Sequence, residues 1–480
     1  MEQIVGLDFG AFAAKVAVLQ PQRPTPLVIA NKTGMRSTVL AVATPTHEGS
    51  DHLLLAESAE QRSHKNLRNT LRHVLPLLGT SSVSDVHPRW RRGMKVQLEE
   101  SDGDLQVGLR QPNGVTTTLT MRQAACHLLQ HVRSYTDEFL HLSPPRACVL
   151  VLPTYVSECS TRRQLLLEAA NEAGWDVRHT VRDSVAICVA HGLDQSEGRQ
   201  QEHCLVIDMA HSRTCVSLLS RFPAGTLRHI DSTTLDVSID SDLDDALVRF
   251  MARKARQAPS RIADIDDRPR SLALLRKEAR RARHALARSA ESLVSVDSLA
   301  DGVPFQCRIS GGRFDNMVSD YVVKVRRGAD ALLSKHGISP DRVLLAGGAA
   351  NLPSVKRALQ QHFMDANVMV QNDAEETAAR GAAVLGEWLS RHSSVAASKT
   401  TETATVPTLP VSVSLRLGED KQLLFNRGTV LPCVRQLDGL QFRGQADVLV
   451  SGTQAPVMTV QVDSDTVLCH VASDGSLVFH

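Results

Sequence analysis

A chain of 480 residues with 42% hydrophobic and 22% charged residues has the composition of a globular protein, long enough for about two to four domains. This composition excludes a disordered, collagen-like or disulfide-dense chain as a description of the whole protein. With 54 Lys and Arg residues against 52 Asp and Glu residues, the net charge is only +2, so any surface that binds a polyanion must be local.

Cysteine usage and the N-terminus indicate the compartment. The nine cysteines include no Cys-X-X-Cys pair, and their irregular spacing is typical of reduced thiols in a cytoplasmic protein. Residues 1–10 begin a strand pattern without the basic and apolar regions of a secretory signal. No run of about 18 apolar residues predicts a membrane span. We therefore expect a cytoplasmic protein that makes no membrane contact.

The strongest internal pattern is a repeat. Residues 4–19 and 204–219 both read as an apolar run ending in an aspartate, a short turn and a second apolar run. Asp8 and Asp208 hold equivalent positions, 200 residues apart. The pattern predicts two β-hairpins, each with an acidic residue at the end of its first strand, and hence two similar lobes.

The segments after each hairpin alternate between strand and helix patterns. Buried strands are predicted at 146–152 and 342–346, and helices at 157–173, 352–363 and 374–389. Strands that alternate with helices in this way are typical of α/β layers whose sheets are covered by helices.

The last 90 residues change in character. Ser, Thr, Ala and Pro dominate residues 391–410, which predicts a linker. Short strand patterns then predict a small β unit, with strands at 411–417, 422–425, 446–450, 457–462 and 466–471. Residues 411–480 are fewer than the roughly 100 residues of a typical two-sheet sandwich, so we expect an abbreviated unit.

Nine segments, in this order, resemble the 70-kDa heat-shock chaperone family. They are GLDFG (6–10), IANKTGMRST (29–38), VLPTYV (151–156), RDSVAICVAHGL (182–193), LVIDMA (205–210), RRARHAL (280–286), ISGGRFDNM (309–317), LLAGGAANLPSV (344–355) and ETAARGAAV (376–384). The resemblance implies an α/β, actin-like ATPase domain with ribonuclease-H-like duplicated lobes at 1–390. It also implies a linker at 391–410 and a truncated all-β substrate-binding-like domain at 411–480, where FNRGTVLP (425–432) is the clearest match. We expect no helical lid.

The layout is most similar to one atypical branch of this family, the heat-shock-70-like subunit of the ribosome-associated complex. The resemblance implies a heterodimer with a zuotin-type J-domain protein. It further implies a cytoplasmic role at the ribosome, where such a subunit would assist the folding of the nascent polypeptide. Its implied cofactor is ATP or ADP with magnesium, bound weakly or not at all for the reasons given below.

The first hairpin keeps part of the family's phosphate-binding turn. Asp8 and Gly10 fit that turn, because small residues let backbone N–H groups approach phosphate oxygens. Ala11 and Phe12 stand where the family has hydroxyl residues. Asp8 would contact a metal through water; the alternative is a turn aspartate without a ligand.

The second hairpin departs further from the family. Asp208 remains as the second acid that would contact a metal through water, but the family's three glycines and threonine are replaced by Ala210, His211, Ser212 and Arg213. Arg213 either offers a cation to a phosphate or fills the vacated space. Cys215 stands where the family has an acid.

The resemblance assigns catalysis to Asp8, Asp183 and Asp208, and it places Leu75 where the family has its catalytic lysine. Phosphoryl transfer depends on cations positioned around the transferred group, so we expect that hydrolysis is lost or small. Arg72 is a second candidate for the missing charge, one helical turn away.

The adenosine pocket is predicted at Arg280, Arg283, His284, Gly347, Gly348 and Ala349. Arg283 matches a lysine of the family and the two glycines are retained, whereas the other polar contacts are replaced. We expect that the shape of the pocket survives while its affinity falls.

Residues 253–288 form a basic stretch with twelve Lys or Arg residues against four acids, a local balance of +8. It predicts either a contact with ribosomal RNA or a solvated helix that borders the nucleotide cleft. No aromatic residues for base stacking are interleaved.

Three functions follow from these patterns. The first is a chaperone subunit that hydrolyses little or no ATP and works with a J-domain partner. The second is a working ATPase or kinase of the actin-like fold, which the retained acids support. The third is an RNA-binding scaffold that uses the basic stretch.

Overall fold

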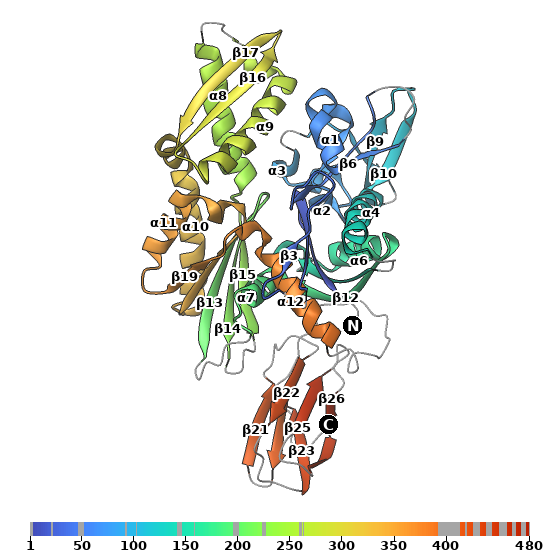
Figure 1. Cartoon of the computed structure of the whole chain (residues 1–480), viewed down its shortest axis with the longest axis vertical. Coiled ribbons are helices and arrows are strands. Elements are labelled where there is room, and N and C mark those ends of the chain that lie inside the picture. The colour runs from blue at the N-terminus through green and yellow to red at the C-terminus, as the bar shows by residue number, and fades with distance from the viewer. Residues whose placement is uncertain are drawn as a thin grey trace.

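The computed structural model describes residues 3–391 with short gaps, together with seven strands between residues 413 and 479. The gaps fall at 21–22, 47–51, 92–93, 102, 142–145, 158, 195–200, 223–226, 259–261 and 263. Two lobes, each built on one mixed β-sheet, make up residues 3–391 (Figure 1).

The two main sheets repeat one topology. The first has the order β12-β11-β1-β2-β3 with β4 paired to β2, and the second has the order β19-β18-β13-β14-β15. Around β1 and β13 alike, two parallel strands lie on one side and antiparallel strands on the other. The duplication predicted from the hairpins is therefore confirmed.

The strands of the first sheet are β1 (Val5–Phe9), β2 (Ala13–Val18), β3 (Leu27–Val28), β4 (Thr38–Val39), β11 (Arg146–Leu152) and β12 (Trp175–Arg182). Those of the second are β13 (Glu202–Met209), β14 (Thr214–Arg221), β15 (Leu227–Leu235), β18 (Arg342–Ala346) and β19 (Asn367–Val370). The predicted strands 146–152 and 342–346 are thus confirmed at β11 and β18.

The first lobe adds helices and two small sheets. Its helices are α1 (Ala56–Arg62), α2 (Val74–Leu77), α3 (Pro88–Arg91), α4 (Met121–Leu140), α5 (Thr154–Ser157) and α6 (Ser160–Glu172). Its small sheets are β6-β5-β7, with β5 (Ala41–Ala43), β6 (Leu54–Leu55) and β7 (Thr70–Arg72), and β10-β9-β8, with β8 (Leu98–Ser101), β9 (Asp104–Arg110) and β10 (Thr116–Thr120).

The second lobe carries the longest helix. Its elements are α8 (Asp245–Gln257), α9 (Pro269–Leu286), α10 (Gly311–His336), α11 (Pro353–His362) and the hairpin β16 (Glu291–Ala300) and β17 (Val303–Ser310). The predicted helix face at 352–363 is confirmed, because Leu352, Val355, Leu359 and Phe363 are all buried.

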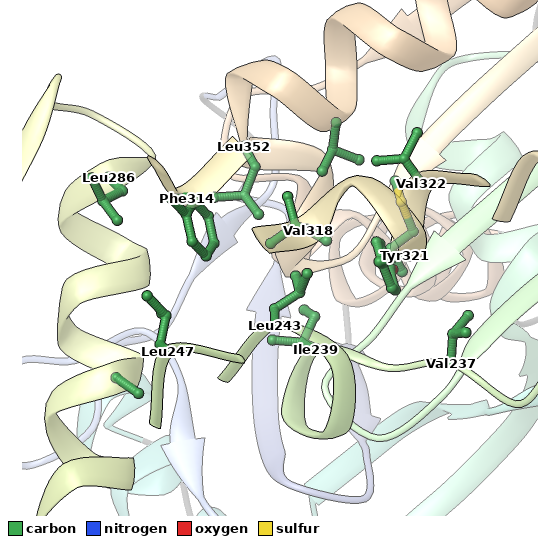
Figure 2. Close-up of a cluster of buried hydrophobic side chains, with 14 of the residues drawn as sticks. Val237, Ile239, Leu243, Leu247, Leu286, Phe314, Val318, Tyr321, Val322 and Leu352 are labelled. Carbon is green, nitrogen blue, oxygen red and sulfur yellow. The ribbon is translucent and has the colours of Figure 1, made fainter. Parts of the chain in front are cut away.

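The core of the second lobe explains why α10 forms. Phe314, Val318 and Tyr321 recur at helical spacing and are buried, so they line one side of the helix. Figure 2 shows these side chains gathered with Leu243 and Leu247. This packing fixes the wall of the lobe from which α9 reaches the cleft.

Two further helices are α7 (Asp183–Ala190) and α12 (Thr377–Arg391). Helix α12 packs against β1, β2 and β11 of the first sheet and against α7, while α7 contacts β11 and β12 of the first sheet and β13 and β18 of the second. A Cβ atom on Gly381 would lie 1.8 Å from the carbonyl oxygen of Ala186, and one on Gly6 would lie 2.3 Å from that of Ala379. Both glycines are therefore needed for the close approach of α12.

Gly381→Ala is expected to lower the free energy of unfolding by about 1–3 kcal/mol, although alanine favours helices, because the new methyl group meets backbone atoms. The control is Gly312→Ala on α10, where a Cβ atom would have no neighbour within 4 Å. Urea unfolding followed by circular dichroism measures both variants. A Gly381→Ala protein as stable as the Gly312→Ala protein would contradict this packing.

Residues 413–479 contain seven antiparallel strands in two sheets, β21-β20-β23-β24 and β22-β25-β26. They are β20 (Val413–Leu417), β21 (Asp420–Phe425), β22 (Cys433–Leu437), β23 (Gly444–Val450), β24 (Met458–Val462), β25 (Val467–Val471) and β26 (Leu477–Phe479). All five predicted strands are present, whereas β22 and β26 were not predicted.

Some sequence predictions fall outside the described residues. Apart from Arg391, the linker 391–410 lies there, as does most of the match at 425–432. The domain boundaries and the absence of a lid stay predictions. Within the described part of the chain, no helix is long and apolar enough to cross a membrane, and the seven cysteines described between residues 126 and 307 are free thiols.

Candidate nucleotide-binding cleft

One cavity of about 740 Å³ collects almost all of the predicted site residues. Both hairpins, α9 and the loop after β18 contribute to its walls. The predicted residues that line it are Asp8, Gly10, Ala11, Phe12, Asp183, Asp208, Ala210, His211, Arg213, Arg280, Arg283, His284, Gly347 and Gly348. Ala349 is fully buried in the adjoining 3₁₀ turn η7 (Gly348–Asn351) and does not line the cavity.

Three carboxylates form the acidic floor of the cavity. Asp8 and Asp208 end the first strands of the two hairpins, and Asp183 begins α7. Burial, and next the charges of Asp183 and Asp8, raise the pKa of Asp208 to about 8. Burial also raises the pKa values of Asp8 and Asp183. We call Asp8, Asp183 and Asp208 the acidic floor. Burial disfavours the charged form of all three of these carboxyl groups.

Asp183 is tied to its own lobe. Its carboxylate accepts hydrogen bonds from Thr154 N at 2.8 Å, Thr154 Oγ1 at 2.9 Å and Ser184 N at 2.7 Å. These bonds use both carboxylate oxygens, so the side chain is held in place without a ligand.

The sequence analysis did not predict Lys15, which lies beside Asp8 at the acidic floor. Its Nζ lies 3.6 Å from Asp8 Oδ2, and it lines the cavity. Burial disfavours the ammonium, but Asp8, Glu375, Asp208 and Glu376 together raise the pKa of Lys15 above its usual value. Its position directly opposite Asp8 in the hairpin was the available signal, because cross-strand partners share a face.

The tips of the two hairpins meet through aromatic rings. The ring centroids of Phe12 and His211 lie 3.8 Å apart at 39°, and the Arg280 guanidinium lies 5.1 Å from the Phe12 centroid. The turn amides are also used: Gly10 N donates to Ala13 O, and Ala210 N donates to Arg213 O, both at 3.1 Å. The rings of Phe12 and His211 therefore occupy part of the space between the tips, where phosphates would enter, although both residues still line the cavity.

Arg213 is packed between aromatic rings. Its guanidinium carbon lies 5.3 Å from the centroid of Tyr155 and 5.7 Å from that of Trp90. Of the two sequence interpretations, this geometry favours the one in which Arg213 fills vacated space.

His211 makes the ring contact sensitive to acid. Burial lowers the pKa of His211 well below 6.5; Asp240 opposes this shift, while Arg280, Arg283 and His73 add to it. A lowered folded-state pKa means that the stability contributed by neutral His211 is present above pH 6.5 and is lost as the pH falls.

His211→Leu is therefore expected to weaken the loss of stability below pH 6.5. Urea unfolding midpoints measured across this range test it, with His52→Leu on the surface as the control. The other buried histidines keep part of the slope, because burial lowers the pKa of His73 and that of His179 to about 4. Equal slopes for the His211 and His52 variants would contradict the prediction.

The predicted adenosine residues take part in ion pairs. Arg283 Nε lies 2.8 Å from Asp244 Oδ1, and both side chains are buried. Arg280 reaches Glu60 in the first lobe at 3.0 Å. Arg283 thus holds α9 against the start of α8, and Arg280 joins the two lobes.

A second set of ion pairs joins the lobes at residue 36. Arg36 lies 2.9 Å from Asp373 and 3.1 Å from Glu376, which flank the turn before α12. Glu376 is almost fully buried, whereas Arg36 is about half exposed. Together with Arg280 and Glu60, these pairs form what we call the cross-lobe ion pairs.

The position of the family's catalytic lysine lies away from the cavity. Leu75 of α2 is fully buried in the core of the first lobe and does not line the cavity. Arg72, the second candidate for the missing charge, pairs with Glu60 at 2.6 Å. Neither side chain contributes a cation to the acidic floor.

Gly347 serves packing as well as the cavity wall. Its φ of +81° lies in the left-handed region, and a Cβ atom there would lie 2.4 Å from Met209 O. The glycine is therefore required by the approach of the β18 loop to β13.

Most of the basic stretch at 253–288 is neutralised within the protein. Seven of its Lys and Arg residues form ion pairs with acids: Arg256, Arg268, Arg276, Arg280, Arg281, Arg283 and Arg288. This pairing favours the interpretation of a helix that borders the cleft, and an RNA contact stays a prediction.

The residues of the floor do not fit a directly bound divalent metal ion. The Lys15 ammonium already pairs with Asp8, and the charge of Asp208 also acts on it. Among the described residues, no group of three His, Cys, Asp or Glu side chains is arranged to hold a metal ion. The prediction that Asp8 and Asp208 contact a metal through water remains a prediction, and no chemical step is routed through a metal.

Two duplicated mixed sheets lie around a common cleft, and an acid lies near the end of the first strand of each hairpin. Residues 4–450 match the sequence profile of the family described as Hsp70 protein, so the chain belongs to the Hsp70 family. This arrangement of sheets is the α/β fold of the Hsp70 ATPase domain. Members of this family typically bind ATP or ADP with magnesium.

Individual relatives are identical to this chain at about a quarter of the aligned positions. Heat shock 70-related protein 5 of Dictyostelium discoideum is 25% identical over 396 residues, covering 79% of this chain and 74% of the relative. A ribosome-associated molecular chaperone of Saccharomyces cerevisiae is 24% identical over 436 residues, covering 90% of this chain and 68% of the relative. A heat shock 70 kDa protein of Neurospora crassa is 26% identical over 443 residues, covering 90% and 65%.

Proposed function

We propose that this chain is an atypical Hsp70-type chaperone subunit that assists the folding of nascent chains with a J-domain partner at the ribosome. It binds ATP or ADP weakly or not at all and hydrolyses ATP little if at all. The observation that carries the proposal is the contact of the Phe12 and His211 rings at 3.8 Å, which narrows the phosphate end of the cleft.

Phosphoryl transfer needs free N–H donors and positioned cations around the transferred group. The Gly10 and Ala210 amides already donate within their turns. Leu75 is in the core and Arg72 is paired with Glu60. The retained acids supply neither requirement, and Lys15, the cation beside them, is already paired with Asp8. This weighs against the alternative of a working ATPase or kinase.

The partners are inferred from likeness. Relatives named ribosome-associated molecular chaperones support a role with nascent polypeptides at the ribosome. The resemblance to the heat-shock-70-like subunit of the ribosome-associated complex supports a zuotin-type J-domain protein as the stable partner. We propose the domain layout 1–390, 391–410 and 411–480 for this subunit, with its last part as a substrate-binding-like β domain.

Single-turnover hydrolysis of labelled ATP, measured with and without the J-domain partner, tests the proposal. We expect no product above the level of the Asp208→Asn variant. ATP turnover by the unaltered protein that the Asp208→Asn change abolishes would establish a working ATPase and contradict the proposal.

A second experiment isolates the effect of the Phe12 and His211 rings at the phosphate end. In calorimetric titrations, the double variant Phe12→Thr with His211→Gly is expected to bind ADP more tightly than the unaltered protein, because it restores a small, hydroxyl-bearing turn. Val115→Thr, an exposed change far from the hairpins in the sequence, serves as the control. Tight ADP binding by the unaltered protein would contradict the proposal that these rings weaken nucleotide binding.

A further inference from the structure

Lys15 places a positive charge on the acidic floor, beside Asp8. Lys15 and Asp8 are direct partners across β1 and β2, and their side chains are only 12% and 15% exposed. A lysine this enclosed is stable only beside compensating acids. The four carboxylates whose charges act on it are Asp8, Asp208, Glu375 and Glu376.

The duplication of the lobes gives an internal comparison. Cys215 lies opposite Asp208 in the second hairpin, just as Lys15 lies opposite Asp8 in the first. The Cys215 thiol is buried, contacts the Thr234 hydroxyl and is no source of positive charge. The charges of both hairpin acids therefore act on a single ammonium, which comes from the first hairpin and pairs with Asp8.

The remaining acid of the floor has its own donors. Asp183 accepts three hydrogen bonds from Thr154 and Ser184, which use both of its oxygens. Asp8 and Asp208 are then the acids left for a cation. A divalent ion beside them would meet the Lys15 ammonium at short range in a poorly solvated site, where like charges repel strongly.

We propose that the Lys15 ammonium is the built-in counter-ion of the acidic floor, in the place of a divalent metal, so that a nucleoside phosphate entering the cleft binds without magnesium. The part that concerns the ligand rests on the proposed function, whereas the part that concerns the counter-ion is a property of the protein alone. An ammonium offers one charge and three hydrogen-bond donors, which suits holding a phosphate.

The counter-ion is tested on the full chain without nucleotide. Lys15→Met leaves the carboxylates of the floor uncompensated, so its melting midpoint is expected to fall by several degrees and to recover at least half of the loss in millimolar MgCl₂. The unaltered protein and the control Lys32→Met, whose lysine pairs with Glu138 at the surface, are expected to show no response to MgCl₂. An equal response of the unaltered protein, or no loss in Lys15→Met, would overturn the proposal.

Two titrations of the unaltered protein keep the proposal testable if Lys15→Met does not fold. Mn²⁺, followed by electron paramagnetic resonance, is expected not to bind, and saturable binding that MgCl₂ displaces would overturn the counter-ion. ADP, followed by calorimetry, is expected to bind with the same Kd in EDTA and in MgCl₂.

The outcomes separate the two proposals. Binding of ADP only in MgCl₂, or no binding in either buffer, overturns the inference about a metal-free ligand. Neither result touches the proposed lack of turnover, which fails only if ATP is hydrolysed in the single-turnover experiment.

Discussion

Arg283→Met is expected to lower the free energy of unfolding by about 3–5 kcal/mol, because it leaves a buried carboxylate without its ion-pair partner. Asp244 is fully buried, and Arg283 reaches its Oδ1 at 2.8 Å. The other oxygen, Oδ2, has no hydrogen-bond partner in the described part of the chain. Burial raises the pKa of Asp244 while Arg283 opposes this shift, so removing Arg283 leaves the carboxylate without its main compensation.

The matched control is Arg281→Met on the same helix. Arg281 is 66% exposed and pairs with Glu278 three residues earlier, so its loss is expected to cost no more than about 0.5 kcal/mol. Urea unfolding without nucleotide compares the two variants. Adding Asp244→Asn to Arg283→Met is expected to restore part of the stability, since it removes the stranded charge. A loss below that of Arg281→Met would show that Arg283 is not structural.

Leu75→Lys is expected to destabilise the first lobe by about 3–5 kcal/mol and to give no ATP hydrolysis. Leu75 has no exposed surface and lies among apolar side chains, so the change removes buried apolar area and buries an amine without a partner. The restored lysine would reach the cleft only if α2 changed its packing.

Leu75→Met, which nearly keeps the volume, is the control and is expected to cost less than about 1.5 kcal/mol. Unfolding by urea and single-turnover hydrolysis are measured on both proteins. A Leu75→Lys protein that keeps its stability and gains turnover would show that the side chain at 75 can serve the site after all.

Strong local patterns explain which elements could be predicted. The hairpins, β11, β18 and the buried face of α11 have continuous or periodic apolar runs that no other structure satisfies as well. The strands β22 and β26 escaped prediction because the polar residues Arg435 and Gln436 interrupt the apolar run of CVRQL, and because LVF spans only three residues. Their pairing with β25 depends on tertiary contacts that a short pattern does not carry.

In the candidate site, too, some features could be predicted from the sequence and others could not. The order of family-like segments located the lining residues, and these come together in one cavity. What could not be predicted is contact between distant segments: Phe12 with His211, Arg213 with Trp90 and Tyr155, and Arg280 with Glu60. Such contacts depend on how the lobes face each other, whereas Lys15 required only the register of one hairpin.

The cross-lobe ion pairs bear on how the two lobes of the domain can move relative to each other. For the lobes to hinge apart, Arg36 must leave Asp373 and Glu376, and Arg280 must leave Glu60. Partly solvated charges are screened by salt, so a higher ionic strength is expected to weaken the cross-lobe ion pairs. Both partners of each pair belong to the chain itself, so the strength of this link between the lobes is expected to vary with ionic strength.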